Sequence, residues 1–119
     1  MIDGAPLLIV EDEPFIAMDL ADAVRAAGGA VIGPVSTVRE GLAPLRDAPV
    51  AGAILDCHLR DRDVSPLAQV LLGFGPPLVV YTVSDIPTAL AHWRLEIPLI
   101  RKPKQPSDVV ARLVGLIED

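Results

Sequence analysis

The chain has 119 residues, of which 51% are apolar, and its formal net charge is −6. This length fits one domain with a single hydrophobic core and is too short for a second folded unit. The acidic charge disfavours direct binding of DNA or RNA, because contacts to phosphates need a basic protein face.

No part of the sequence is typical of a membrane or secreted protein. The longest apolar runs fall far short of the roughly 20 residues that span a bilayer. The N-terminus has no basic start and turns acidic after a few apolar residues, which argues against a secretory signal. Cys57 is the single cysteine, so no internal disulfide can form. These features predict a cytoplasmic protein.

Short apolar segments alternate along the chain with longer segments of helical spacing. The apolar segments lack the polar alternation of half-exposed strands and are therefore typical of buried parallel strands. Five such strands are predicted at Leu7–Val10, Ala30–Ile32, Ala53–Leu55, Leu78–Tyr81 and Pro98–Ile100.

Four helices are predicted between and after these strands. The first begins at Pro14 and ends at Gly28-Gly29, since proline is favoured in the first turn and glycine past the end. Thr37 and Glu40 have capping-box spacing at the start of the second. The apolar positions of the four helices are Ile16, Leu20, Val24 and Ala27; Leu42 and Leu45; Leu67, Val70 and Leu71; and Val109, Leu113, Leu116 and Ile117.

The segment between Tyr81 and Pro98 has room only for a short or irregular helix, because Pro87 and Pro98 restrict it. The whole pattern is a βα unit repeated five times. It predicts an α/β fold, in which an open, doubly wound parallel sheet carries helices on both faces. The strand order expected for such a sheet is the flavodoxin-like order 2-1-3-4-5.

Four of the predicted strands end in residues that can take part in chemistry. Glu11 and Asp12 follow the first strand, Asp56 the third, Thr82 the fourth and Lys102 the fifth. Ligands of doubly wound sheets bind beyond the carboxyl ends of the strands, where the strand order reverses. The first and third strands are neighbours at that point, so the three carboxylates should converge.

Converging carboxylates repel one another, and a hard cation relieves this repulsion. Mg²⁺ prefers oxygen ligands, keeps several waters and bridges readily to phosphate. A carboxylate can also act as a nucleophile and form an aspartyl phosphate. Lys102 would supply a point charge to the phosphoryl oxygens, and Thr82 a hydrogen bond. The sequence therefore predicts a magnesium-assisted phosphorylation site.

The motifs IVEDE, ILDCHL, VVYTV and IRKP occur in this order at four strand ends. Together they resemble the four signatures of bacterial response-regulator receiver domains, the CheY-like family, over nearly the whole chain. The resemblance implies that Asp56 accepts the phosphoryl group and that Lys102 pairs with it. It also implies that Asp12 and Asp56 bind Mg²⁺ directly, that Glu11 acts mainly through water, and that the main-chain carbonyl of His58 is a further ligand.

The resemblance also has implications for partners. A receiver takes its phosphoryl group from a histidine kinase or a phosphotransfer protein and catalyses its own phosphorylation, without being a conventional enzyme. The segments PLLIVEDEPFIAMDLADAV and VIGPVSTVREGL are similar to single-domain regulators of alphaproteobacteria, which typically work with HWE-type or related kinases. We therefore expect one receiver domain over residues 1–119, without an output domain, that signals by contact with a downstream protein. The Lys102-Pro103 bond is expected to be cis.

Three positions depart from the family pattern. Leu99 stands where many receivers carry Tyr or Phe, so there is no ring to flip on phosphorylation. Val83 stands where Ala or Gly is usual, and its extra methyl groups could crowd the site. Arg60 stands where Pro is frequent, in a charged loop that is expected to be solvated.

Two other functions stay open at this point. Leu99 and Val83 favour a binding module that keeps the fold without the phosphorylation cycle. A small hydrolase would have the nucleophile and the metal, but the sequence offers no lid and no second general acid. Zinc is disfavoured, because His58 and His92 have no Cys or His nearby at ligand spacing.

Overall fold

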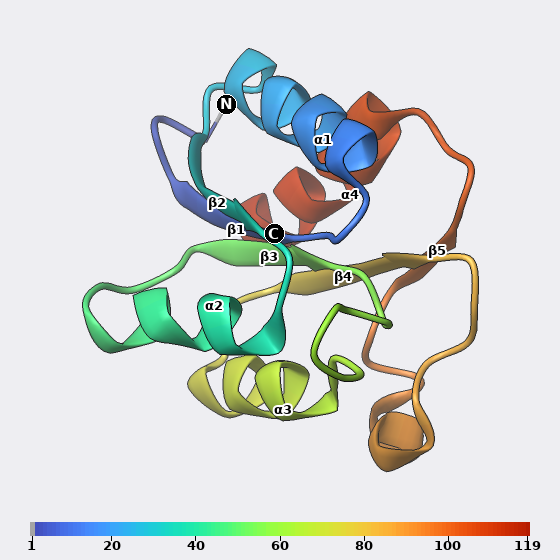
Figure 1. Cartoon of the computed structure of the whole chain (residues 1–119). Coiled ribbons are helices and arrows are strands. Elements are labelled where there is room, and N and C mark those ends of the chain that lie inside the picture. Colours follow the sequence, from blue (N-terminus) through green and yellow to red (C-terminus); the bar gives the residue numbers. More distant parts are fainter. Residues whose placement is uncertain (1) are drawn as a thin grey trace.

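Five parallel strands form one sheet in the order β2-β1-β3-β4-β5, as predicted. The computed structural model describes residues 2–119 (Figure 1). The strands are β1 (Pro6–Val10), β2 (Ala30–Val35), β3 (Gly52–Leu55), β4 (Leu78–Thr82) and β5 (Leu99–Arg101). Each begins within one residue of its predicted start, and β2 runs three residues further than predicted.

The interior strands are buried because each has a neighbour on both sides. Every residue of β3 and β4 is buried, and so is β1 after its first residue. β2 and β5 form the two edges of the sheet and are only partly buried. The expectation of five buried strands is therefore wrong for the edge strands, whose apolar composition does not reveal their position in the sheet.

Helices cover both faces of the sheet (Figure 1). α1 (Pro14–Ala26) and α4 (Pro106–Glu118) lie on one face, and α2 (Val38–Leu42) and α3 (Ser65–Phe74) lie on the other. The core of the first face includes Leu20, Val24, Val79, Tyr81, Val109 and Leu113. The core of the second face includes Val38, Leu55, Leu67, Leu71 and Leu90.

The short helix α2 is linked to the loop that follows β3. The Thr37 hydroxyl accepts a hydrogen bond from the Glu40 amide at 3.0 Å, as expected at a capped helix start. The Asp61 carboxylate accepts from the Val38 amide at 2.9 Å and from the Arg39 amide at 3.2 Å. Arg60, Asp61 and Arg62 are exposed, which confirms the expectation of a solvated loop, and Asp61 also bonds this loop to α2.

The segment between β4 and β5 contains one short 3₁₀ helix, η2 (Thr88–Trp93), which confirms the prediction of a short or irregular element. Leu90 is its buried residue, and Trp93 packs partly buried against the core of the second face. A further 3₁₀ helix, η1 (Ala43–Arg46), follows α2. Within residues 2–119, none of the helices has the length and apolar character that crossing a membrane requires.

Candidate functional site

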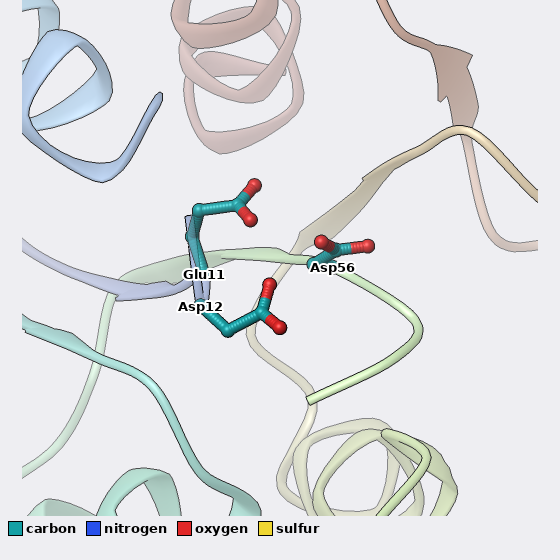
Figure 2. Close-up of side chains that lie close together, drawn as sticks. All are labelled: Glu11, Asp12 and Asp56. Atoms are coloured by element: carbon teal, nitrogen blue, oxygen red, sulfur yellow. The ribbon is translucent and has the colours of Figure 1, made fainter. Parts of the chain in front are cut away.

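Three carboxylates meet at the carboxyl edge of the sheet (Figure 2). Glu11 and Asp12 follow β1, and Asp56 follows β3, which pairs with β1 as far as Val10 and Leu55. One oxygen atom from each of the three side chains lies within 4.8 Å of the others. The predicted convergence is confirmed, and it arises because β1 and β3 are neighbours in the sheet.

Lys102 reaches this cluster from the end of β5. Its Nζ lies 2.8 Å from Oε1 of Glu11 and 3.0 Å from Oδ2 of Asp56. Only 11% of its side chain is exposed, so solvent screens these ion pairs weakly. The other Asp56 oxygen, Oδ1, accepts a hydrogen bond from the Cys57 amide at 2.7 Å. When all three carboxylates are ionised, the single ammonium leaves two of their negative charges uncompensated.

Burial and mutual contact drive apart the pKa values of the two acids that contact Lys102. Burial, reinforced by Asp56, raises the pKa of Glu11 to about 7, although the hydrogen bond from Lys102 opposes the rise. Burial also disfavours charge on Asp56, but hydrogen bonds from Glu11 and Lys102 outweigh it and hold the pKa of Asp56 below its ordinary value. The same contacts outweigh burial at Lys102 and raise its pKa. Asp56 is therefore ionised at neutral pH, and Glu11 is the acid whose protonation changes near pH 7.

Thr82 ends β4 beside this cluster and is fully buried. Its hydroxyl lies 3.2 Å from the Ser84 hydroxyl and accepts a hydrogen bond from the Ser84 amide at 3.3 Å. β4 is the neighbour of β3, and Thr82 contributes to the low pKa of Asp56. The Thr82 hydroxyl is thus close to Asp56 while it is bonded to the loop that follows β4.

The surroundings of the cluster differ in part from what the sequence indicates. Val83 follows the last residue of β4 and is 73% exposed, so its side chain is not packed into the core beside the cluster. Arg60 lines a cleft of about 220 Å³ together with Glu11 and Asp12.

The His58 side chain is exposed, and the role of its main-chain carbonyl stays a prediction. The Lys102-Pro103 peptide bond is cis, as expected.

No role is predicted from the sequence for three residues beside the site: Tyr81, Ser84 and Arg101. The Arg101 guanidinium donates to the Ser84 carbonyl at 3.1 Å and also pairs with Asp85. The Tyr81 hydroxyl bonds to the backbone of Lys104. The one feature of the sequence that could have pointed to these three residues is their position, because each lies within two residues of Thr82 or Lys102.

No family model matches the sequence. Among curated proteins, the Phyllosphere-induced regulator PhyR of Methylorubrum extorquens is 34% identical over 108 residues, which make up 88% of this chain. The match takes up 40% of PhyR, so the chain spans less than half the length of this relative.

Solved structures extend the similarity over the full chain. SdrG from Sphingomonas melonis Fr1 is 32% identical, with a TM-score of 0.80 and 100% of both chains covered. A BeF₃-activated conformation of SdrG is 34% identical, with a TM-score of 0.72 and 97% of both chains covered. The receiver domain of the sensor histidine kinase PA1611 from Pseudomonas aeruginosa PAO1, which holds a magnesium ion in its active-site cleft, shares the fold. It is 19% identical, with a TM-score of 0.78, and the match covers 98% of this chain and 99% of that domain.

Fold and similarity lead to the same family. The sheet has the strand order of CheY-like receivers. The similarity to SdrG extends over the entire length of both proteins. The chain therefore belongs to the response-regulator receiver family of two-component systems, and it is a phosphoacceptor signalling regulator rather than a conventional enzyme.

Proposed function

We propose that Asp56 is the phosphoacceptor and takes its phosphoryl group from a phosphohistidine. The donor would be a histidine kinase, of the HWE type or a related one, or a phosphotransfer protein. The observation that carries this proposal is the ion pair between the buried Asp56 carboxylate and the Lys102 ammonium at 3.0 Å. Asp56 is 8% exposed, and its low pKa keeps it ionised and nucleophilic at neutral pH.

The side chains around Asp56 suit phosphoryl transfer. An oxygen of Asp56 would attack phosphorus while the P–N bond to the donor imidazole breaks, and the imidazole would leave with the electron pair of that bond. Lys102 would turn from the carboxylates to a phosphoryl oxygen and keep its charge. The Thr82 hydroxyl would leave Ser84 and donate a hydrogen bond to another phosphoryl oxygen.

The acidic cluster fits Mg²⁺. Two oxygens bound to one Mg²⁺ are at most about 4.2 Å apart, since each bond is about 2.1 Å long. The carboxylate oxygens lie within 4.8 Å of one another, so at most a small inward movement would bring Asp12 and Asp56 to one ion. Glu11, which already contacts Lys102, would act through water, and the main-chain carbonyl of His58 would be a further ligand. When bound, Mg²⁺ neutralises charge on the transferring phosphoryl group.

Two relatives support these assignments. The PA1611 receiver, which has the same fold, coordinates magnesium in its active-site cleft. SdrG has a BeF₃-activated conformation, as a protein with a phosphorylation-dependent shape would. We propose that this chain likewise acts as one receiver domain in the cytoplasm and that a downstream protein recognises its phosphorylated form.

Binding of beryllofluoride, a phosphoryl analogue, tests the proposal by ¹⁵N NMR in the presence of Mg²⁺. We expect the largest shifts at the amides of Asp56, Thr82 and Lys102. Asp56→Asn is the matched control, because it removes the charge with little change in size. That variant should show no response to beryllofluoride. No shifts in the wild-type protein, or the same shifts in the variant, would contradict the assignment of Asp56.

A further inference from the structure

We infer that Tyr81 is a positioning residue for Lys102: it fixes the loop that carries Lys102 and thereby sets where the ammonium meets the phosphoryl group. The inference rests on the function proposed for Asp56 and Lys102. The polar contacts of Tyr81 go to Lys102 and Lys104, so its effect would pass through the lysine.

The Tyr81 hydroxyl holds the loop between β5 and α4 at a single residue. It donates a hydrogen bond to the Lys104 carbonyl at 3.0 Å and accepts one from the Lys104 amide at 3.1 Å. The residue between the two lysines is Pro103, which has no amide proton to anchor the loop. One hydroxyl thus restrains both the position and the orientation of the backbone two residues after Lys102.

The other end of this short loop is held by the residue next to Tyr81. The Lys102 amide donates to the Thr82 carbonyl at 2.9 Å, which continues the pairing of β4 with β5. Because Tyr81 and Thr82 are consecutive in β4, one rigid interior strand determines the path of the chain on both sides of Pro103. Loosening either bond would let the base of the lysine side chain shift.

The ring of Tyr81 also faces the lysine. The Lys102 Nζ lies 5.5 Å from the ring centroid, within the range of a cation–π contact. Tyr81 is 4% exposed and belongs to the core of the first face, so neighbouring side chains hold the ring in place. The ammonium therefore contacts the aromatic ring as well as the carboxylates of Glu11 and Asp56.

These contacts of Lys102 matter for phosphoryl transfer because a lysine side chain without such contacts is poorly ordered. Its four-carbon stem has many rotamers, and a catalytic charge acts best when it is already near its working position. The contacts of Tyr81 restrict both the backbone from which the stem starts and the space through which the stem can turn. We therefore expect the loss of the Tyr81 hydroxyl to slow phosphoryl transfer without affecting the metal site, whose carboxylates follow β1 and β3.

Tyr81→Phe tests this inference, because it keeps the ring and removes both hydrogen bonds to Lys104. The measurement is the rate at which acetyl phosphate labels the protein at saturating Mg²⁺, followed on Phos-tag gels. We expect the rate to fall roughly threefold to tenfold, as the loss of one or two hydrogen bonds would predict. Mg²⁺ affinity, measured by calorimetry, should stay unchanged.

Val79→Ala is the control for a merely structural role, since Val79 lies two residues earlier in β4 and packs in the same core. It should lower the melting temperature without slowing labelling. A double-mutant cycle gives the sharper test: in a Lys102→Ala background, Tyr81→Phe should cause no further loss. An unchanged rate in Tyr81→Phe, equal slowing in Val79→Ala, or additive losses with Lys102→Ala would each overturn the inference.

Asp56→Asn, run in parallel, separates this inference from the proposed function. Labelling of Asp56→Asn at the wild-type rate would remove the proposed acceptor and the basis of the inference with it. If Asp56→Asn is unlabelled while Tyr81→Phe is labelled at the wild-type rate, the proposed acceptor stands and the role of Tyr81 alone is refuted.

Discussion

The Thr82 hydroxyl lies 3.2 Å from the Ser84 hydroxyl, in the loop that follows β4. Arg101 holds this loop through the Ser84 carbonyl at 3.1 Å and through an ion pair with Asp85. A Thr82 hydroxyl that moves to a phosphoryl oxygen must therefore give up Ser84. The unphosphorylated protein has a competing hydrogen bond that phosphorylation has to break.

Replacing Ser84 by alanine should ease this movement. Ser84→Ala removes the competing hydroxyl but keeps the amide that also bonds to Thr82. We expect beryllofluoride to bind about twofold to tenfold more tightly, because one hydrogen bond no longer has to be broken. An NMR titration measures this affinity. Ser107→Ala, at an exposed position of α4, is the control and should not alter it. Equal or weaker binding by Ser84→Ala would show that the contact does not oppose activation.

The response to phosphorylation should appear mainly in residues 83–93 rather than at position 99. Leu99 is half-buried against the core of the second face and has no ring to reorient. The segment after Thr82 contains one 3₁₀ helix, so its backbone should be among the least stable parts of the fold. A bias of about 1–3 kcal/mol, the usual size of allosteric coupling, is enough to reorder it.

Hydrogen exchange with and without beryllofluoride measures this response. Protection should change chiefly in residues 83–93, with smaller changes near Leu99. A change confined to the loop after Asp56 would contradict this route. Because Asp61 in that loop accepts hydrogen bonds from the first amides of α2, such a result would place the response at α2 instead.

Mg²⁺ affinity should depend on Asp12 more than on Glu11. Asp12 has an oxygen in the acidic cluster, whereas Glu11 is paired with Lys102 at 2.8 Å. We expect Asp12→Ala to weaken binding by roughly tenfold or more, about 1.4 kcal/mol or above, and Glu11→Gln to weaken it less. Calorimetry measures both. Asp22→Ala removes an exposed carboxylate from α1 and should bind Mg²⁺ like the wild-type protein. Unchanged affinity in Asp12→Ala would remove that residue from the metal site.

The free energy of unfolding of the metal-free protein should depend on pH because Glu11 titrates. Its pKa is raised from 4.5 to about 7 by burial and by Asp56. Below about pH 4.5 the group is protonated in both the folded and the unfolded state, and its contribution to stability is complete. Between pH 4.5 and 7 mainly the unfolded chain ionises, so the free energy of unfolding should fall as pH rises, by roughly 3 kcal/mol.

Urea unfolding in EDTA at several pH values measures this fall. Glu11→Gln cannot ionise, so its free energy of unfolding should lack this component and the two curves should diverge between pH 4.5 and 7. Saturating Mg²⁺ should reduce the difference, because a cation favours the ionised carboxylate. Parallel curves for the two proteins across this range would show that the Glu11 pKa is not raised.

Strand positions and converging carboxylates could be predicted because each depends on local patterns and on one topological rule. Apolar runs locate β1, β3 and β4, and the strand order brings Asp56 beside Glu11 and Asp12. The partial burial of β2 and β5 could not be predicted, since their apolar residues resemble those of interior strands. Whether a strand lies at the edge depends on the whole sheet, and the sequence of a strand of three to six residues does not show it.

The long-range hydrogen bonds of Tyr81 and Asp61 could not be predicted from the sequence either. Tyr81 and Lys104 are 23 residues apart, and their contact depends on the path of the loop after β5. Asp61 stands in a run of charges that is typical of a solvated loop, yet it accepts two hydrogen bonds from α2. Residue type limits which bonds such side chains can make, and tertiary structure selects among them.

Labelling of Asp56→Asn by acetyl phosphate in the presence of Mg²⁺ tests the assignment of the phosphoacceptor most directly. Asparagine keeps the size of the side chain and removes the nucleophilic carboxylate, so no shifted band should appear on Phos-tag gels. The wild-type protein and Asp22→Asn, a matched change at an exposed position of α1, should both give that band. A shifted band of wild-type intensity in Asp56→Asn would place the phosphoryl group on another residue and contradict the proposed function.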